Sequence, residues 1–358
     1  MTFTAATPVD LRSDTVTQPD EKMRAAMATA KVGDNVLEHD PTMRELEERA
    51  AELLGKPAAL WIPSGTMANL IALSLHLQRG DRYLAPEAAH VLTDELGSGA
   101  WLAGGMPHPL PTDAGPGRPS VQTLTKAVEG AADPPPYYAL RTRLLCLENT
   151  HTNAGGAVMP PHEHAQLVAV AQEAGLAVHL DGARLWNAAV ALGVPPAALT
   201  VGTDTVTACL SKGLGAPVGS VVAGSEEFVA RARRMRQMLG GGVRQGGVLA
   251  AAGLCALENI DALAMDHANA RRLAAGLAEL GWDVDEPQTN IVMARVPDVP
   301  RTMQVLTELG VLVLSGGGRI RFVTHRDVSE GDIDSVLDRL ADASRRKVLD
   351  PGPSAQVG

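Results

Sequence analysis

The chain has 358 residues, 45% hydrophobic and 20% charged, which is typical of a globular protein large enough for two domains. Its formal net charge of −10 argues against a surface for nucleic acid or anionic membrane. The chain carries no apolar run of the ~18–20 residues that a membrane span needs, and its N-terminus lacks the layout of a signal peptide. We therefore expect a cytoplasmic protein without membrane or nucleic-acid partners. Its three cysteines predict buried thiols rather than disulfides or a zinc site: Cys146, Cys209 and Cys255.

Apolar strands alternate with amphipathic helices through the first two thirds of the chain. This order predicts an α/β fold with a largely parallel sheet covered by helices on both faces. A capping-box pattern at Thr42 and Glu45 predicts the start of one helix, and Gly55 its end. A strand at 217–224 follows the preceding strand so closely that the two could pair antiparallel. The expected strands are 58–62, 143–149, 176–183, 204–212 and 217–224, and the expected helices lie near 42–54, 64–77 and 164–175.

The pattern changes at the glycine-rich stretch 239–247, after which a long helical segment runs to about Leu280. Short strands near 282–285, 290–295, 311–314 and 319–323, with helices at 299–309 and 329–345, predict a small α+β domain. We expect residues 1–248 to form an N-terminal segment and the large domain, residues 249–345 the small domain, and residues 346–358 a disordered tail. Segments 113–120 and 133–136 predict loops.

Lys212 follows an apolar strand and is surrounded by glycines. In open α/β sheets, ligands bind at the carboxyl ends of strands, and a partly desolvated lysine there can form a Schiff base. A solvated loop lysine is the competing interpretation. Asp181 ends another apolar strand, and a lysine Schiff base with an aspartate at a ring nitrogen is the pattern of pyridoxal phosphate. Asp181 could instead cap the following helix, and Arg184 could bind the cofactor, bind a substrate carboxylate or pair with Asp181.

Other polar residues stand at the ends of predicted strands. Ser64, Gly65 and Thr66 occupy a strand-to-helix turn of the kind that binds phosphate, although such turns are often only helix caps. His90 could stack on a pyridine ring and move a proton, with Glu95 as a possible support. The stretch from Glu148 to His151 is either a site or a capped loop. Arg319 and Arg321 share one face of a strand, and one of them could clamp a carboxylate.

These motifs, in order over about residues 10 to 345, resemble the L-threonine aldolases among the fold type I, aspartate-aminotransferase-like pyridoxal-phosphate enzymes. The resemblance rests on LRSDTVT (11–17), VGDNVLEHDPT (32–42), PSGTMANL (63–70), AAH (88–90), LENTH (147–151), HLDGARLWNA (179–188), CLSKGLGAPVGS (209–220), GGGVRQ (240–245) and RFVTH (321–325). It implies a large domain with a mostly parallel seven-stranded sheet, a small C-terminal α+β domain, and a homo-oligomer, a dimer of dimers, with active sites at subunit interfaces.

The resemblance also implies roles for single residues. Lys212 would carry the cofactor, Asp181 would face its ring nitrogen and His90 would stack on its ring. His151 would lie near the substrate hydroxyl. The remaining cofactor-binding residues would be Ser64, Gly65, Thr66, Arg184, Ser211 and Arg244, the last from a neighbouring subunit, and the substrate carboxylate would be held by Ser13 and Arg321 with Arg184 nearby.

The expected reaction is reversible retro-aldol cleavage of L-threonine and related β-hydroxy-α-amino acids to glycine and an aldehyde. β-Elimination, racemisation and a non-catalytic cofactor-binding protein are the alternatives, and no GxGxxG follows the first strand to support a nucleotide-binding module. The chain departs from the family pattern at Leu37, where a tyrosine is usual, and after His90, where Val91, Leu92, Thr93 and Asp94 replace aromatic residues. These departures put the shape of the aldehyde-side pocket in question.

Overall fold

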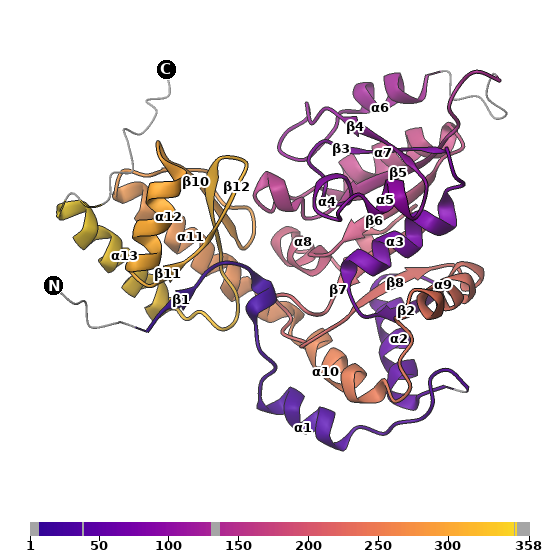
Figure 1. The fold of residues 1–358 in the computed structure, drawn as a ribbon, viewed down its shortest axis with the longest axis horizontal. Helices are drawn as coiled ribbons and strands as arrows, with labels where there is room; N and C mark the ends of the chain where they lie inside the picture. The colour runs from indigo at the N-terminus through magenta and orange to yellow at the C-terminus, as the bar shows by residue number, and fades with distance from the viewer. Residues whose placement is uncertain (1–6, 38, 130–136, 347, 349–358) are drawn as a thin grey trace.

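A computed structural model describes residues 7–37, 39–129, 137–346 and 348 of the chain. A large part built on a seven-stranded sheet lies beside a smaller part built on a four-stranded antiparallel sheet (Figure 1). The expected α/β architecture with a small α+β unit is therefore confirmed. Both described ends of the chain lie at the small part.

The large sheet is parallel except at one strand. β8 pairs antiparallel with both β7 and β2, while the other neighbours run parallel. The predicted antiparallel pairing of 217–224 with the preceding strand is therefore confirmed. In spatial order the strands are β2 (Ala58–Ile62), β8 (Ser220–Gly224), β7 (Thr205–Cys209), β6 (Ala177–Gly182), β5 (Thr142–Glu148), β3 (Arg82–Pro86) and β4 (Met106–Leu110).

The two faces of this sheet pack into different cores because alternate residues of a strand point to opposite faces. Val178, Leu180 and Val206 join the main core with one layer of helices, whereas Leu60 and Val222 pack with the helices of the other layer. The first layer is α2 (Pro41–Leu53), α6 (Val121–Val128), α7 (Pro161–Glu173), α8 (Leu185–Leu192) and α10 (Gly247–Leu257), with α1 (Glu21–Thr29) against α10. The second is α3 (Gly65–His76) and α9 (Glu226–Met238), with the short α4 (His90–Thr93) and α5 (Ser98–Trp101) nearby.

The small part has its own hydrophobic core. Its sheet is covered by three helices, and the N-terminal strand β1 (Val9–Asp10) pairs with β11 (Val311–Leu312). Its other elements are β12 (Leu314–Gly316), β13 (Arg319–Val323), β10 (Ile291–Arg295), β9 (Asp283–Val284), α11 (Leu263–Glu279), α12 (Val299–Glu308) and α13 (Glu330–Arg345). The 3₁₀ turns of the chain are η1 (Asp14–Val16), η2 (Thr152–Ala154), η3 (Pro196–Leu199) and η4 (Ile260–Ala262).

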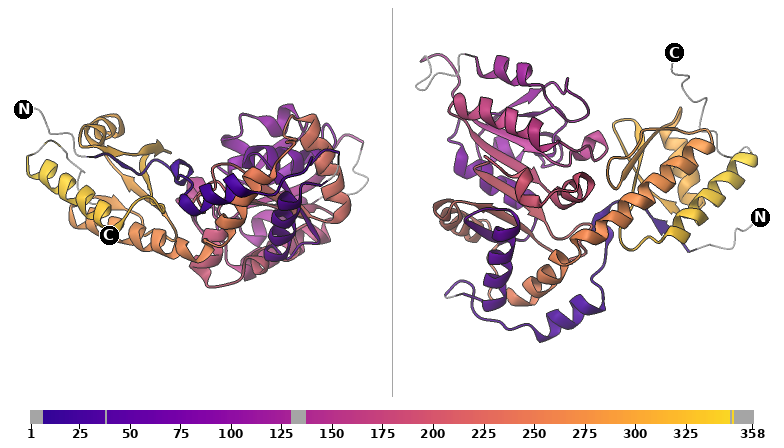
Figure 2. Two further views of the ribbon diagram at one scale, coloured as in Figure 1. Left: turned by 90° about the horizontal axis from the view of Figure 1, so that it is seen from below. Right: turned by 180° about the vertical axis from the view of Figure 1, so that it is seen from behind.

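One local prediction was wrong. The helix expected from the pattern at Thr42 begins at Pro41, because Asp40 caps it by accepting from the Met43 amide at 3.0 Å. The helical segment expected up to about Leu280 is confirmed, and it consists of two helices, α10 and α11, bent by 54° (Figure 2). Strand β4 (MPHPL) was not predicted, because its two prolines are typical of edges and turns.

The helix pair α10–α11 connects the two parts. α10 packs in the large core, and four of the five buried hydrophobic side chains of α11 pack in the small one. The division of domains at residue 248 stays a prediction, segment 133–136 lies outside the described residues, and so does almost all of the expected tail. Within the described chain no single helix has the length and apolarity of a membrane span, and only the bent pair α10–α11 reaches them jointly. The three cysteines are buried and free, as predicted.

Candidate active site

A cavity of about 340 Å³ lies at the carboxyl ends of the sheet strands, where the sequence predicted a site. Lys212 reaches it from the loop after β7, and Asp181 from the end of β6. The two segments lie together because β6 and β7 are parallel neighbours in the sheet. Eight of the predicted residues line this cavity: Ser64, Gly65, Thr66, His90, Glu95, Asp181, Ser211 and Lys212.

Asp181 is buried and its two oxygens are held by different donors. The Ala183 amide donates to Oδ1 at 3.0 Å, and Nδ2 of Asn69 donates to Oδ2 at 2.8 Å. Asp181 does not cap a helix, because α8 begins only at Leu185 and has no side-chain cap. Asn69 was missed in the sequence analysis, although an asparagine within an apolar helix, once buried, needs a polar partner.

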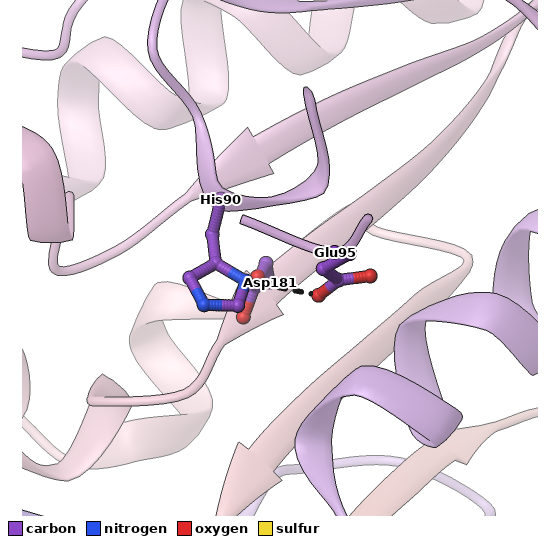
Figure 3. Close-up of side chains that lie close together, drawn as sticks. All are labelled: His90, Glu95 and Asp181. Atoms are coloured by element: carbon purple, nitrogen blue, oxygen red, sulfur yellow. Dashed lines mark hydrogen bonds and ion pairs between the residues drawn. The ribbon is translucent and has the colours of Figure 1, made fainter. Parts of the chain in front are cut away.

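His90 lies beside Asp181 and Glu95 in the cavity (Figure 3). Nδ1 of His90 is 3.0 Å from Oε1 of Glu95, and this hydrogen bond raises the pKa of the imidazole. Burial raises the pKa of Glu95 in turn. One donor atom from each of the three residues lies within 4.8 Å of the others, so the group could also hold a metal ion. No metal was expected from the sequence, and that stays a prediction.

The first turn of α3 forms one wall of the cavity. Ser64 caps this helix by accepting from the Met67 amide at 3.2 Å, which leaves the amides of Gly65 and Thr66 without a partner in the helical ladder. Such free amides, at the positive end of the helix dipole, bind phosphate. A Cβ atom at Gly65 would lie 2.9 Å from Sγ of Cys209, so a larger residue would have to push this turn and the sheet apart. An amine, a carboxylate, an imidazole and an anion cradle around one cavity fit pyridoxal phosphate.

Arg184 is buried and bound to Asp14, not to Asp181. Its Nε and Nη2 donate to the two oxygens of Asp14 at 2.8 and 2.7 Å, and Nη1 donates to Thr152 at 3.0 Å. Burial by itself would raise the pKa of Asp14, but the charge and hydrogen bonds of Arg184 hold it well below its usual range. Asp14 was missed because it pairs across 170 positions of sequence. It is the buried acidic residue of the quoted motif LRSDTVT.

Arg321 lies near this pair. Burial lowers its pKa, and the positive charge of Arg184 lowers it further. Among the described residues its only hydrogen bond is a long one to the Arg12 carbonyl, at 3.5 Å, and its Nε has no partner. A cation that is desolvated and close to another cation gains by binding an anion. Arg319 is instead paired with Asp285 at 2.8 Å, and Ser13 caps η1 by accepting from the Thr15 amide.

His151 is buried beside a second cavity of about 550 Å³, which reaches β10 and β13 of the small part. Neither ring nitrogen has a hydrogen-bond partner among the described residues, and Oε2 of Glu148 is 3.8 Å from Nε2. Glu148 accepts from the amides of His90 and Thr152, both at 2.8 Å. In the stretch 148–151, Glu148 and Asn149 therefore hold neighbouring loops in place through hydrogen bonds. His151 is the residue of this stretch that lines a cavity with ring nitrogens that are unpartnered within the described chain.

Arg244 lies outside the cavity of Lys212. Its side chain is 58% exposed and makes a loose ion pair with Asp34 at 3.4 Å. Leu37, at the departure from the family pattern, is 83% exposed on the same loop as Asp34. Within one chain, therefore, the structure does not bring Arg244 to the other predicted cofactor residues.

Comparisons with known proteins find relatives that span most of the chain. Residues 10–298 match the beta-eliminating lyase family. The chain is 42% identical to a probable low-specificity L-threonine aldolase 2 of Arabidopsis thaliana, over 94% of this chain and 97% of that one. It is also 42% identical to a low specificity L-threonine aldolase of Escherichia coli, over 92% and 97%. A solved structure of a threonine aldolase from Leishmania major shares the fold with a TM-score of 0.80, covering 96% and 100%, at 22% identity.

The match to the family covers most of the chain, and the two relatives span nearly its whole length. The resemblance inferred from the motifs is therefore confirmed: this chain belongs to the beta-eliminating lyase family, together with the low-specificity L-threonine aldolases.

Proposed function

We propose that the protein is a carbon–carbon lyase that cleaves L-threonine, L-allo-threonine and related β-hydroxy-α-amino acids to glycine and an aldehyde. The observation that carries the proposal is the single cavity in which Lys212, Asp181 and His90 meet the first turn of α3. The names of the relatives supply the substrate class, because the cavity alone would suit other reactions of amino acids.

The cofactor is pyridoxal phosphate, which when bound supplies an acceptor for the electron pair left behind as the Cα–Cβ bond breaks. Lys212 would hold it covalently, and the amides of Gly65 and Thr66 with Ser64 and Ser211 would bind its phosphate end. Asp181 would keep the ring nitrogen protonated, because a buried carboxylate favours a neighbouring positive charge. His90 would cover one face of the ring.

His151 is the better candidate for the base that takes the proton of the substrate hydroxyl. Its two ring nitrogens are unpartnered among the described residues, whereas Nδ1 of His90 is engaged by Glu95, which favours the protonated imidazole. Arg321 would bind the substrate carboxylate bidentately. Ser13 and Arg184 would support it, Arg184 through its fixed position beside Asp14. A gripped carboxylate would set the angle of the breaking bond to the ring.

A cytoplasmic homotetramer, a dimer of dimers with shared active sites, is part of the proposal. The exposed positions of Arg244, Leu37 and Met238 support an interface at this surface, since Leu37 and Met238 are 83% and 73% exposed. A cavity of about 710 Å³ between residues 35–36 and α9 lies there too. Arg244 of one subunit would then reach the phosphate bound in its neighbour.

The test is an absorbance spectrum of the purified protein before and after adding L-threonine or L-phenylserine, with aldehyde release followed in the same sample. We expect a cofactor band that is absent in Lys212→Ala, together with aldehyde and glycine. In His151→Phe the band should remain while aldehyde release falls about 10²-fold or more, the usual range for loss of a general base. Exposed His162→Phe is the matched control.

Other outcomes identify the alternatives. A cofactor band with elimination or racemisation products, but no aldehyde, would move the assignment to those reactions. A band without any turnover would favour a non-catalytic binding protein. Loss of activity on chelation would assign His90, Glu95 and Asp181 to a metal ion instead. If pyridoxal phosphate produces no band at all, the proposal is wrong at its centre.

A further inference from the structure

A row of buried polar side chains continues behind Asp181, away from the cavity. His179 and Thr205 are directly opposite in the β6–β7 register, as are Asp181 and Thr207. All four belong to the face of the sheet opposite the main core, since Val178, Leu180 and Val206 alternate with them. Helix α3 contacts β6 and β7 and carries Asn69 and His76, which are seven residues apart on one side of the helix.

The hydrogen bonds of this row form an unbroken chain. Asn69 Nδ2 bonds to Asp181 at 2.8 Å, and Asn69 Oδ1 lies 3.1 Å from Nε2 of His179. Nδ1 of His179 lies 2.9 Å from Oγ1 of Thr205. The same hydroxyl lies 2.9 Å from Nε2 of His76, whose ring stacks on Phe228. These hydrogen bonds lead from the cavity to His76, at the C-terminal end of α3, where its ring meets α9.

The donor and the acceptor of each hydrogen bond in this row can be assigned by starting at the cavity. Asn69 Nδ2 faces the oxygens of Asp181 and Glu95, at 2.8 and 2.7 Å, so the amide nitrogen must be on that side. Oδ1 of Asn69 can then only accept, from the Thr207 hydroxyl at 3.0 Å and from Nε2 of His179. All four hydrogen-bonding positions of Asn69 are thereby used.

The two histidines are fixed by the same logic. The His179 ring is fully buried and its two nitrogens face Thr205 and Asn69, neither of which carries a charge that could balance an imidazolium, so the ring is neutral. Since Nε2 donates, Nδ1 must accept from Thr205. The single hydroxyl proton of Thr205 is then used, so Nε2 of His76 must donate to Thr205. Each donor therefore points toward Asp181, and aligned hydrogen bonds in a low-dielectric interior polarise one another.

We propose that His76, Thr205, His179 and Asn69 form a directional donor chain that orients Asp181 and holds it as a carboxylate for the ring nitrogen of the cofactor. These four are positioning residues, since only Asp181 would touch the cofactor. The proposal rests on the proposed function, because it assumes that pyridoxal phosphate places its ring nitrogen at Asp181.

The test compares two cofactors on the full-length apoprotein: pyridoxal phosphate and its carbocyclic analogue, in which a C–H group replaces the ring nitrogen. In Thr205→Val, affinity for pyridoxal phosphate should fall about threefold to tenfold, the range expected for one lost hydrogen bond. Affinity for the analogue should not change, because the analogue offers Asp181 no ring nitrogen. Thr205→Ser should restore the wild-type value, and Thr302→Val, a buried threonine in α12, should change neither affinity.

His76→Phe is the second variant, in case Thr205→Val does not fold. His76 is only partly buried, and a phenyl ring can keep the stack on Phe228 while removing the first donor. We expect about a twofold loss for pyridoxal phosphate alone, smaller because the lost bond is farther from Asp181. If a variant loses affinity equally for both cofactors, or if neither variant loses affinity for pyridoxal phosphate, the proposed donor chain is wrong. If the wild-type protein binds no pyridoxal phosphate through Lys212, the proposed function itself fails, a result distinct from both.

Discussion

The buried carboxylates of the site have identified donors, whereas Asp266 on α11, near the site, does not. Its side chain is 2% exposed, and within the described part of the chain its Oδ2 has no hydrogen-bond partner. It lies next to the loop of Lys212, since a Cβ atom at Gly213 would be 3.6 Å from Oδ2. Burial, with the negative charge of Asp14, raises the pKa of Asp266 to about 7.

This raised pKa predicts that Asp266 makes the protein less stable as the pH rises. In the unfolded chain an aspartate titrates near ~3.9, so between about pH 4 and pH 7 the folded state binds more protons. The favourable contribution of protonated Asp266 to the free energy of unfolding is thus complete below about pH 4 and lost above about pH 7. Asp266→Asn removes this dependence, so the variant should gain about 1–3 kcal/mol relative to wild type between pH 5 and pH 8.

The measurement is the free energy of urea unfolding of both proteins at the two pH values. Asp261→Asn, which removes an exposed carboxylate from the adjacent η4, is the control and should shift stability by the same small amount at each pH. A constant difference between Asp266→Asn and wild type would show that Asp266 titrates alike in the folded and unfolded chains.

At the scale of elements, the cap of α2 makes more hydrogen bonds than an ordinary helix cap. Oxygens of Asp40 accept from the Met43 amide at 3.0 Å and from the amides of Gly33 and Gly247 at 3.1 and 2.8 Å. One buried carboxylate thus fixes the start of α2, the preceding loop and the start of α10. The sequence pattern at Thr42 could not reveal this, because two of the three amides belong to other segments.

Asp40→Ala should therefore cost about 2–4 kcal/mol of unfolding free energy, because three amides, two of them in buried contacts, lose their acceptor. Asp298→Ala is the matched control, an exposed cap of α12 that accepts from a single amide, Arg301, and it should cost about 1 kcal/mol. Chemical denaturation of the two variants gives both values. Equal losses would mean that the amides of Gly33 and Gly247 find other partners or water.

Helices and strands could be predicted where the spacing of apolar residues along the sequence matches the face that the element buries in the fold. The buried strands β5, β6 and β7 and the segments of the small part were found because each is apolar at its own spacing. β4 was not, because its pairing with β3 outweighs the poor strand propensity of its prolines. The bend after Leu257 was also missed, since the residues on both sides have helical propensity.

The candidate site was predictable to a similar extent and for a similar reason. Residues that end parallel strands, such as Asp181, or follow them, such as Lys212, must meet at one edge of the sheet. Asn69 and Asp14 were missed because their partners are distant in sequence, and no local pattern encodes such a pairing. Arg244 was assigned through the family resemblance alone, and the fold of one chain leaves it outside the cavity.

At the scale of the whole molecule, the position of Arg244 predicts that one chain does not build a complete site. The closed symmetry of a homodimer would place Arg244 of each subunit at the site of the other. Arg244→Ala and Lys212→Ala should each be inactive as homo-oligomers, one lacking the phosphate contact and the other the covalent link. A hybrid of the two has one site with both Lys212 and Arg244 intact, because each subunit supplies what its neighbour lacks.

Co-expression with two different affinity tags isolates such hybrids, which should recover about half of wild-type activity, one complete site in every two. Arg345→Ala, which removes another exposed arginine, should be active as a homo-oligomer, without co-expression of a second variant. Light scattering on the same sample gives the number of subunits. Hybrids that form but stay inactive would place Arg244 at its own site or away from the chemistry, and the shared-site arrangement would then have to be given up even if the protein is an oligomer.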